Sequence, residues 1–189
     1  MKKRILVTGF DPFGGDDVNS AWEAVCGLPN RLDETELCKL QIPTVFSLAA
    51  QTVIAKAEQL QVQGILCVGQ ASSRTAITPE RIGINLRCAR IPDNTGLQPL
   101  DEPIVPGGPD GLFSTVDINA MTQAITDAGL PAQISNTAGT FVCNDVLYTL
   151  LYHFRGSQIQ IGFIHVPRLG AGLSREQLTL GLSAAIGQM

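Results

Sequence analysis

The sequence predicts an α/β protein in which helices cover both faces of a twisted, mostly parallel sheet. Strand patterns and helix patterns alternate along the 189 residues. Two strand candidates, "ILVTG" and "GILCVG", are continuous apolar runs, which is typical of strands covered on both faces. Two others, "CKLQI" and "IGINLRC", alternate between apolar and polar residues, so some strand pairs are expected to be antiparallel. The length and the 44% hydrophobic content fit one compact domain, residues 1–189.

Six segments are the expected strands. In the alternating ones, the apolar residues fall at positions 38, 40 and 42 and at positions 82, 84, 86 and 88. The expected strands are Arg4–Gly9, Leu37–Pro43, Gly64–Gly69, Ile82–Ile91, Ala132–Asn136 and Ile159–Val166.

Five segments between the strands are expected helices. Asn19 and Asp117 stand where a side chain can cap a first turn, and Gly129-Leu130-Pro131 is a standard helix stop. Residues 92–116 are rich in proline and glycine and predict a long loop, which in a compact domain is usually functional or mobile. The expected helices are Ser20–Gly27, Ser47–Val62, Asp117–Ala128, 140–155 and Ser174–Met189.

Charge and hydropathy narrow the expected partners. The net charge is −4 and no Lys/Arg run follows the first four residues, so neither nucleic acid nor an acidic membrane surface is expected as a partner. No apolar stretch approaches the roughly 18 residues that span a bilayer. The start "MKKRILVTGF" faintly resembles a secretory leader, but "DPFGG" interrupts it, and we interpret it as a first strand. Five cysteines without CxxC spacing then suggest reduced thiols and a cytoplasmic location.

The loop Gly9–Gly15 follows the first strand and raises the possibility of a phosphate site. It lacks GxGxxG, and its GxxxxG is followed by Gly15-Asp16 instead of Lys and Ser/Thr, so this signal is weak. Phe10 and Phe13 flank Asp11-Pro12 on the same loop. They either form the walls of a pocket for a flat apolar group or pack under the loop, and composition does not distinguish the two hypotheses.

The stretch "GTFVCNDVLY" places Cys143 at the start of an expected helix. Its spacing to the apolar face that begins at Val146 favours a buried filler, which is what most free cysteines are. Thr140 is a plausible N-cap, however, and would put the thiol in the first turn, where free N–H groups and the helix dipole favour an anion. The neighbouring Asp145 would oppose that effect. Filler and nucleophile both remain open on these residues alone.

A thiol nucleophile needs a base, and the chain has two histidines. His153 stands near the end of the same helix, roughly 15 Å from Cys143 along its axis. His165 ends the strand pattern "IQIGFIHVP", where open α/β sheets commonly bind ligands, and is either a site residue or a hydrogen-bonded histidine of the core. Glu80 in "AITPERIGIN" precedes another strand and is a candidate to orient the imidazole, or a solvated turn residue. Two histidines twelve apart and no HExxH give too few ligands for a metal, so none is expected.

Seven segments taken together are more specific than any one of them. They are "ILVTGFDPFGGDDVNSAWEAV", "IPTVF", "VGQASSRTAITPERIGIN", "ARIPDN", "FSTVDINAM", "SNTAGTFVCNDVLY" and "GFIHVPRL". In this order they resemble the type I pyroglutamyl peptidases (pyrrolidone-carboxylate peptidases), a family of cysteine peptidases, over nearly the whole chain. The resemblance implies an α/β/α sandwich, a homotetramer, no cofactor, and hydrolysis of the bond after an N-terminal pyroglutamyl residue of peptides.

The resemblance also implies roles for individual residues. It implies a triad of nucleophile Cys143, base His165 and orienting acid Glu80, acting through a thioacyl intermediate. Arg90 resembles an arginine near the family's nucleophile and is expected to support substrate binding. The implied pocket for the lactam ring consists of Phe10, Phe13, Thr44, Ile91, Phe141, Val142 and Val146, with polar contacts from Asn19 and Gln70.

Two alternatives to the peptidase remain. One is a nucleotide-binding α/β protein that uses the Gly9–Gly15 loop, and the other is a non-catalytic relative that keeps the pocket. The chain also departs from the family pattern: Arg168 replaces the tyrosine usual after "HVP", and the segment between Cys143 and His165 is about two residues short. These departures bear on subunit contacts and on the recognition of residues beyond the scissile bond.

Overall fold

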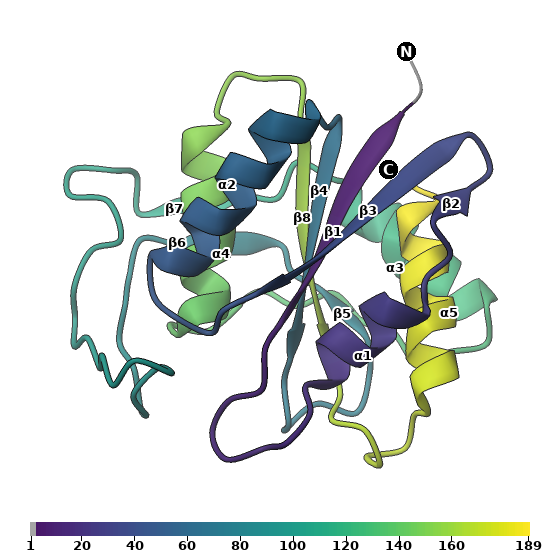
Figure 1. Cartoon of the computed structure of the whole chain (residues 1–189), viewed down its shortest axis with the longest axis horizontal. Coiled ribbons are helices and arrows are strands. Elements are labelled where there is room, and N and C mark those ends of the chain that lie inside the picture. The colour runs from purple at the N-terminus through teal and green to yellow at the C-terminus, as the bar shows by residue number, and fades with distance from the viewer. Residues whose placement is uncertain (1–2) are drawn as a thin grey trace.

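The computed structural model describes residues 3–189, and its centre is a six-stranded sheet in the order β2-β3-β1-β4-β8-β5. The four inner strands are parallel, whereas β2 and β5 lie antiparallel to their neighbours at the two edges. This confirms the predicted α/β class and its mostly parallel, mixed sheet (Figure 1). The strands of this sheet are β1 (Arg4–Phe10), β2 (Arg31–Leu32), β3 (Thr35–Ile42), β4 (Gly64–Gln70), β5 (Thr78–Pro79) and β8 (Gln160–Val166).

Five helices cover the sheet in two layers, and Figure 1 shows α2 and α4 on one face and α1, α3 and α5 on the other. Each layer encloses its own apolar core. Val53 of α2 and Val146 of α4 belong to one core, and Val25 of α1, Met121 of α3 and Leu178 of α5 to the other. All five helices fall within the predicted segments. They are α1 (Ser20–Gly27), α2 (Leu48–Leu60), α3 (Ile118–Asp127), α4 (Val142–His153) and α5 (Arg175–Ile186).

The first helix packs unusually close to the sheet because of Gly9. A Cβ atom at this position would lie 2.7 Å from the Cα atom of Trp22 in α1, so only glycine fits there. Asn19 caps α1 as predicted, since its side chain accepts a hydrogen bond from the Ala21 N–H at 3.0 Å. Asp117 caps α3 in the same way. The first glycine of the Gly9–Gly15 loop is therefore explained by helix packing.

Two predicted strands are wrong in extent. Only the start of the predicted strand Ile82–Ile91 is regular: β6 (Ile82–Ile84) pairs antiparallel with β7 (Gly111–Phe113) in a separate two-stranded sheet. Beyond β6 the backbone is held by a side chain, because the Asn144 amide group donates to the carbonyls of Ile84 and Leu86 and accepts from the Ile84 N–H. The predicted strand Ala132–Asn136 makes only isolated bridges, at Ala132 and Ser135. The apolar pattern did not indicate that the backbone of the first segment bonds to a side chain, or that the second segment makes only isolated bridges instead of a continuous ladder.

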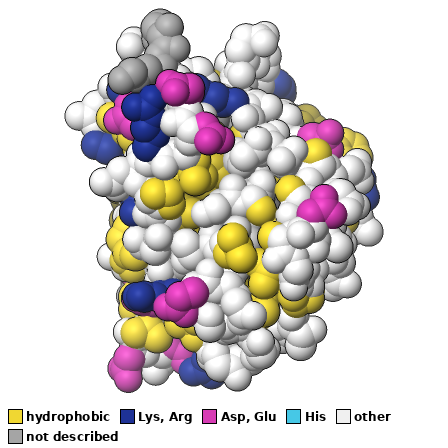
Figure 2. All heavy atoms as spheres, turned by 90° about the vertical axis from the view of Figure 1, so that its right-hand side faces the viewer, with side chains coloured by type: hydrophobic (Ala, Val, Ile, Leu, Met, Phe, Trp, Pro, Cys, Tyr) yellow, Lys and Arg dark blue, Asp and Glu magenta, His cyan; other side chains and the backbone are white. Residues whose placement is uncertain are grey.

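The outer surface carries mixed charges. Figure 2 shows basic side chains lying beside acidic ones on the face that carries α5, and Arg175 approaches Glu23 there to 3.7 Å. Within residues 3–189, no helix is both long enough and apolar enough to cross a bilayer.

Candidate active site

The start of α4 places Cys143 as the second residue of that helix, in the first turn as predicted. The predicted cap is wrong: Phe141 occupies the N-cap position, and the Thr140 hydroxyl donates instead to the carbonyl oxygen of Cys88 at 2.7 Å. The first intrahelical bond runs from the Asp145 N–H to the Phe141 carbonyl at 3.1 Å. The N–H groups of residues 142–144 thus have no acceptor within the helix, as at every helix start.

The Cys143 thiol rests against the sheet at Gly69. A Cβ atom built on Gly69 would lie 2.9 Å from the Cys143 Sγ atom and 2.9 Å from the Phe163 ring. In the β4–β8 ladder Gly69 pairs with His165. The thiol therefore sits directly beside the strand position that carries the histidine, and the absence of a side chain at Gly69 makes this approach possible.

His165 and Glu80 form a hydrogen-bonded pair beneath the surface. The His165 Nδ1 atom lies 2.7 Å from the Glu80 Oε1 atom, and both residues are buried. Glu80 directly follows β5, and its N–H donates to the Phe163 carbonyl of β8 at 2.8 Å, which sets the carboxylate beside the imidazole. Since Nδ1 faces Glu80, Nε2 is the nitrogen available on the other side of the ring.

Burial dominates the titration of the two reactive groups. It raises the pKa of the Cys143 thiol to about 12, and the negative charge of Glu80 adds to the rise. Burial also lowers the pKa of His165, although the hydrogen bond and the charge of Glu80 act in the opposite direction. At neutral pH the resting pair is therefore an uncharged thiol and an uncharged imidazole.

A cavity of about 570 Å³ opens at the carboxyl ends of β4 and β8. This is the edge of an open α/β sheet at which ligands usually bind. Cys143 and His165 both line it, together with two arginines, and no Asp or Glu belongs to the lining. Within residues 3–189 no group of three or more His, Cys, Asp or Glu side chains is arranged to hold a metal ion. The lining consists of Phe13, Gln70, Ala71, Ser72, Ser73, Arg74, Cys88, Arg90, Ile91, Thr137, Ala138, Gly139, Thr140, Phe141, Cys143 and His165.

Seven of the predicted site residues line this cavity, and two of them form an aromatic wall. The rings of Phe13 and Phe141 lie 6.2 Å apart, and Phe46 supports Phe141 from behind in an edge-to-face contact at 5.3 Å. Ile91 is 44% exposed at the mouth, and Arg90 is exposed beside it. The seven are Phe13, Gln70, Arg90, Ile91, Phe141, Cys143 and His165.

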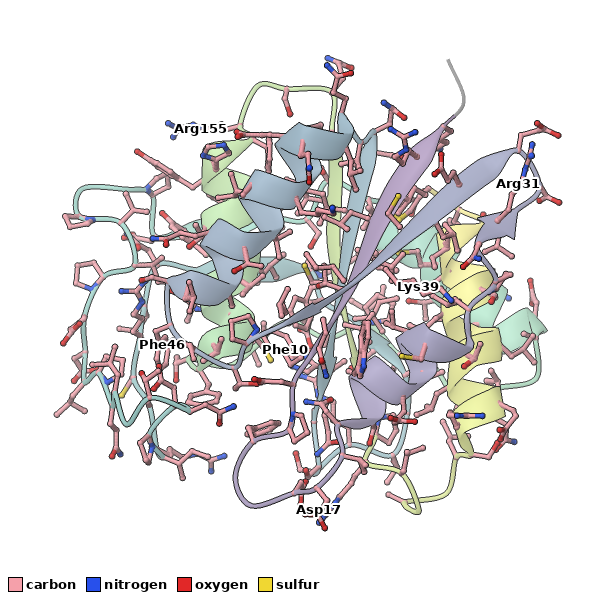
Figure 3. All side chains as sticks on the ribbon, viewed as in Figure 1. Phe10, Asp17, Arg31, Lys39, Phe46 and Arg155 are labelled. Atoms are coloured by element: carbon pink, nitrogen blue, oxygen red, sulfur yellow. The ribbon has the colours of Figure 1, made fainter. Side chains whose placement is uncertain are left out.

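Five predicted pocket residues lie behind the lining. Phe10 packs at 6.3 Å from Phe163, and Figure 3 shows it with Phe46 on the side of the sheet that carries α2 and α4. Asn19 and Thr44 hold the backbone of Asp11, through hydrogen bonds of 3.0 and 3.2 Å to its carbonyl. Val142 and Val146 are fully buried in the core beneath α4. These five residues are buried and do not belong to the cavity lining, so their part in a lactam pocket stays a prediction.

The start of α1 is closed to a phosphate group. The Ser20 N–H donates to Gln70 Oε1 at 2.8 Å, and the Ala21 N–H donates to the Asn19 side chain. Gln70 also donates through Nε2 to Asp16 at 3.0 Å, and Asp16 in turn pairs with Arg168. Because side chains already occupy these N–H groups, the nucleotide alternative on the Gly9–Gly15 loop gains no support.

Two charged groups near the site have partners that the sequence did not indicate. Asp145, expected to oppose an anionic thiol, is fully buried and pairs with Arg87 at 2.6 Å, and it accepts the Ser47 N–H at 2.8 Å. Arg74 lies 2.5 Å from Glu80. The Asp145–Arg87 pair joins residues far apart in the chain. Arg74 stands in the segment "VGQASSRTAITPERIGIN", but no role was expected for it, and only the three-dimensional arrangement shows what it contacts.

Comparison with known proteins places this geometry in a family. Residues 3–181 match the family model described as pyroglutamyl peptidase. A pyrrolidone-carboxylate peptidase of Streptococcus pyogenes serotype M12 is 45% identical over 194 residues, covering 97% of this chain and 90% of that protein.

Solved structures agree. The pyroglutamyl peptidase I of Bacillus amyloliquefaciens is 40% identical and superposes with a TM-score of 0.94, over 98% of this chain and 96% of that one. A mutant pyrrolidone carboxyl peptidase of the hyperthermophile Pyrococcus furiosus is 34% identical with a TM-score of 0.92, over 97% and 96% of the two chains. The chain therefore belongs to the pyroglutamyl peptidase family.

Proposed function

We propose that this protein hydrolyses the bond after an N-terminal pyroglutamyl residue of peptides, with Cys143 as nucleophile, His165 as base and Glu80 as the orienting acid. The observation that carries the proposal is the position of the thiol against Gly69, beside a histidine that Glu80 holds through a 2.7 Å hydrogen bond. A thiol beside a histidine that a carboxylate holds is the arrangement of a hydrolytic triad.

The uncharged resting pair favours attack assisted by a base. His165 Nε2 accepts the thiol proton as the sulfur bonds to the pyroglutamyl carbonyl carbon, and Glu80 stabilises the imidazolium that forms. The N–H groups at the start of α4, which have no acceptor within the helix, stabilise the oxyanion. The C–N bond then breaks, and His165 gives its proton to the leaving amine, which leaves a thioester on Cys143. Water attacks the thioester as its proton passes to His165, and His165 returns that proton to the sulfur as the C–S bond breaks, which restores the thiol.

The cavity suits an uncharged ring. Pyroglutamate has no charged α-amine, so a carboxylate in the pocket would have no partner, and the lining holds none. The rings of Phe13 and Phe141 offer apolar walls to a flat lactam. The Gln70 oxygen accepts from the Ser20 N–H and hydroxyl and its Nε2 donates to Asp16, so one N–H of the Gln70 amide remains to donate to a ligand. The apolar side chains thus form one part of the cavity, and polar side chains such as Ser72 and Thr137 form the rest of its lining.

Assembly and location are also proposals. A homotetramer is supported by the family and by exposed apolar side chains such as Leu100 (71%) and Phe113 (66%). A cytoplasmic location is supported by five cysteines that form no disulfide.

Hydrolysis of a chromogenic pyroglutamyl amide tests the proposal. Cys143→Ser and His165→Ala are expected to lower kcat/KM by about 10³-fold or more with the fold intact. Cys26→Ser, which changes an exposed thiol on α1, is the matched control and should keep full activity. Full turnover by Cys143→Ser would refute the mechanism. Binding of pyroglutamate without turnover in the unmodified protein would instead favour the non-catalytic alternative.

A further inference from the structure

We propose that Arg74 is a positioning residue of the active site, which holds the Glu80–His165 pair in its reactive geometry and joins that pair to the cavity wall. The inference rests on the proposed function, because it takes His165 as the base. It concerns a residue in the loop between β4 and β5 to which the family resemblance assigned no role.

The Arg74 guanidinium reaches two separate segments of the chain. Its Nη1 atom donates to Glu80 Oε1 at 2.5 Å and to the Thr78 hydroxyl. Its Nη2 atom donates to the Ser135 hydroxyl at 3.1 Å and to the Thr137 carbonyl at 3.0 Å. Each terminal nitrogen is thus shared between two acceptors, a use of the rigid fork that lysine cannot reproduce.

Both acceptors of Nη1 hold His165. Glu80 Oε1 bonds to the imidazole, and the Thr78 hydroxyl donates to the His165 carbonyl at 3.2 Å. Thr78 also pairs with His165 in the β5–β8 ladder. Arg74 therefore contacts the residue that orients the ring and the residue that fixes its backbone.

The contact between Arg74 and Glu80 also brings a positive charge to a buried carboxylate. The Glu80 side chain is fully buried, and among residues 3–189 its Oε2 atom has no hydrogen-bond partner. A buried carboxylate without a cation is strongly unfavourable, and the Arg74 side chain, 20% exposed, supplies one while keeping contact with the cavity. The pKa of His165 is lowered first by burial and further by the charge of Arg74, against the raising effect of Glu80.

The other half of the fork reaches the wall that leads to the nucleophile. Thr137 lines the cavity together with residues 138–140, which run into α4 and Cys143, and Ser135 lies two positions before Thr137. One guanidinium thus ties the base to the segment that precedes the nucleophile. A displacement of about 1 Å between reacting groups can cost roughly 100-fold in rate, so such a tie is expected to affect kcat.

The experiment compares Arg74→Met with Arg81→Met. Arg81 is a matched control, because its Nε atom donates to Asn136 at 2.7 Å, in the same segment, but it has no bond to Glu80. Arg74→Met is expected to lower kcat about 100-fold with a smaller change in KM and to move the acid limb of kcat/KM to higher pH. Arg74→Lys should restore part of kcat, and Arg81→Met should leave kcat and the acid limb in place.

A second readout does not depend on activity. The chain has two histidines, so NMR titration of the ring of His165, assigned with His153→Gln, monitors the base without substrate. The pKa of His165 should rise in Arg74→Met, because a positive charge that lowers it is gone. This result would stand even if the proposed reaction were wrong, which the Cys143→Ser assay decides separately.

Three outcomes would overturn the positioning role. The first is that Arg74→Met changes neither kcat nor the titration of His165. The second is that Arg74→Met raises KM alone, which would indicate direct substrate binding. The third is that Arg81→Met loses as much kcat as Arg74→Met. Should Arg74→Met not fold, Arg74→Lys carries the test. Its loss of the fork is expected to lower kcat relative to the unmodified protein, and full kcat with an unchanged acid limb would refute the proposal.

Discussion

Gly69→Ala tests how closely the nucleophile depends on the sheet beneath it. The added methyl group would lie 2.9 Å from the Cys143 Sγ atom and 2.9 Å from the Phe163 ring, whereas ordinary contacts begin at 3.4 Å. The thiol must therefore retreat by about 0.5 Å or more, because the sheet cannot give way as easily. Gly69 lies in a regular strand, so the alanine itself adds no backbone strain.

The expected cost divides between stability and rate. Overpacking of a core site lowers the free energy of unfolding by about 1–3 kcal/mol. A shift of the nucleophile by half an ångström or more is expected to lower kcat by about tenfold or more. The assays are thermal unfolding and steady-state hydrolysis of a pyroglutamyl amide, with the folded fraction measured by circular dichroism.

Gly162→Ala is the matched control on the opposite face of the sheet. Its methyl group would lie 2.7 Å from a methyl group of Val116, in the core formed with α1, α3 and α5. It should destabilise the protein by a similar amount, about 1–3 kcal/mol, and leave kcat of the folded fraction nearly unchanged. If Gly69→Ala kept the kcat of the unmodified protein, or lost no more than Gly162→Ala, the thiol would not be held as described.

Four further predictions concern charge. Arg87→Met leaves the Asp145 carboxylate buried without its cation and should destabilise the fold by about 3–5 kcal/mol. Burial raises the pKa of Asp145, so a falling pH protonates the carboxylate and removes the buried charge. The loss of stability measured by thermal unfolding should therefore shrink as the pH falls. Burial lowers the pKa of His165, so kcat/KM should hold at pH values below the usual histidine range and fall only through that lowered pKa. In the same pH series, alkylation of Cys143 by iodoacetamide should keep accelerating above the ordinary thiol pKa of about 8.5, because burial raises the Cys143 pKa to about 12. Because the mouth carries exposed Arg90 and no carboxylate, kcat/KM should favour peptides with Asp over Lys after pyroglutamate, and Arg90→Gln should lower that ratio by about two- to fivefold.

Each of these has a contradicting result. If Arg87→Met were as stable as the unmodified protein at every pH, Asp145 would not need its cation. An acid limb above the usual histidine range would contradict an uncharged resting base. A plateau of the alkylation rate near the ordinary thiol pKa would show that burial does not hold the Cys143 thiol uncharged. Equal kcat/KM for the Asp and Lys peptides would remove Arg90 from substrate selection.

Local signals predicted most of the fold. Asn19 and Asp117 cap helices where the sequence placed them, because a cap depends on residues two or three positions away. The alternation through Ile82–Ile91 misled, because the Asn144 side chain, which lies on α4, bonds the backbone where a ladder was expected. That bond joins residues about sixty positions apart, and spacing along the chain carries no trace of it.

The site was predicted through resemblance more than through pattern. Residues alone left Cys143 open between filler and nucleophile, and the structure explains why: the thiol packs on the apolar face of α4 and also reaches the cavity. The fit of the thiol on Gly69 was missed, because it depends on how α4 packs on β4 beside β8. The role of Arg74 was missed although Glu80 is only six positions away, because the conformation of the loop that brings the two together has no periodic signal. The predicted pocket residues Phe10, Thr44 and Val146 lie behind the lining, a distinction of depth that sequence does not encode.

The most direct test of the triad is to trap its acyl intermediate. The enzyme is mixed with a pyroglutamyl ester or amide and quenched in acid during turnover. It is then digested, and the masses of its peptides are measured by mass spectrometry. We expect one pyroglutamyl group on the peptide that contains Cys143, and none in Cys143→Ala. In Glu80→Gln the modified peptide should accumulate if hydrolysis of the thioester slows more than its formation. Turnover by Cys143→Ala at the rate of the unmodified protein, or a pyroglutamyl group on another residue, would contradict the assignment of Cys143 as the nucleophile.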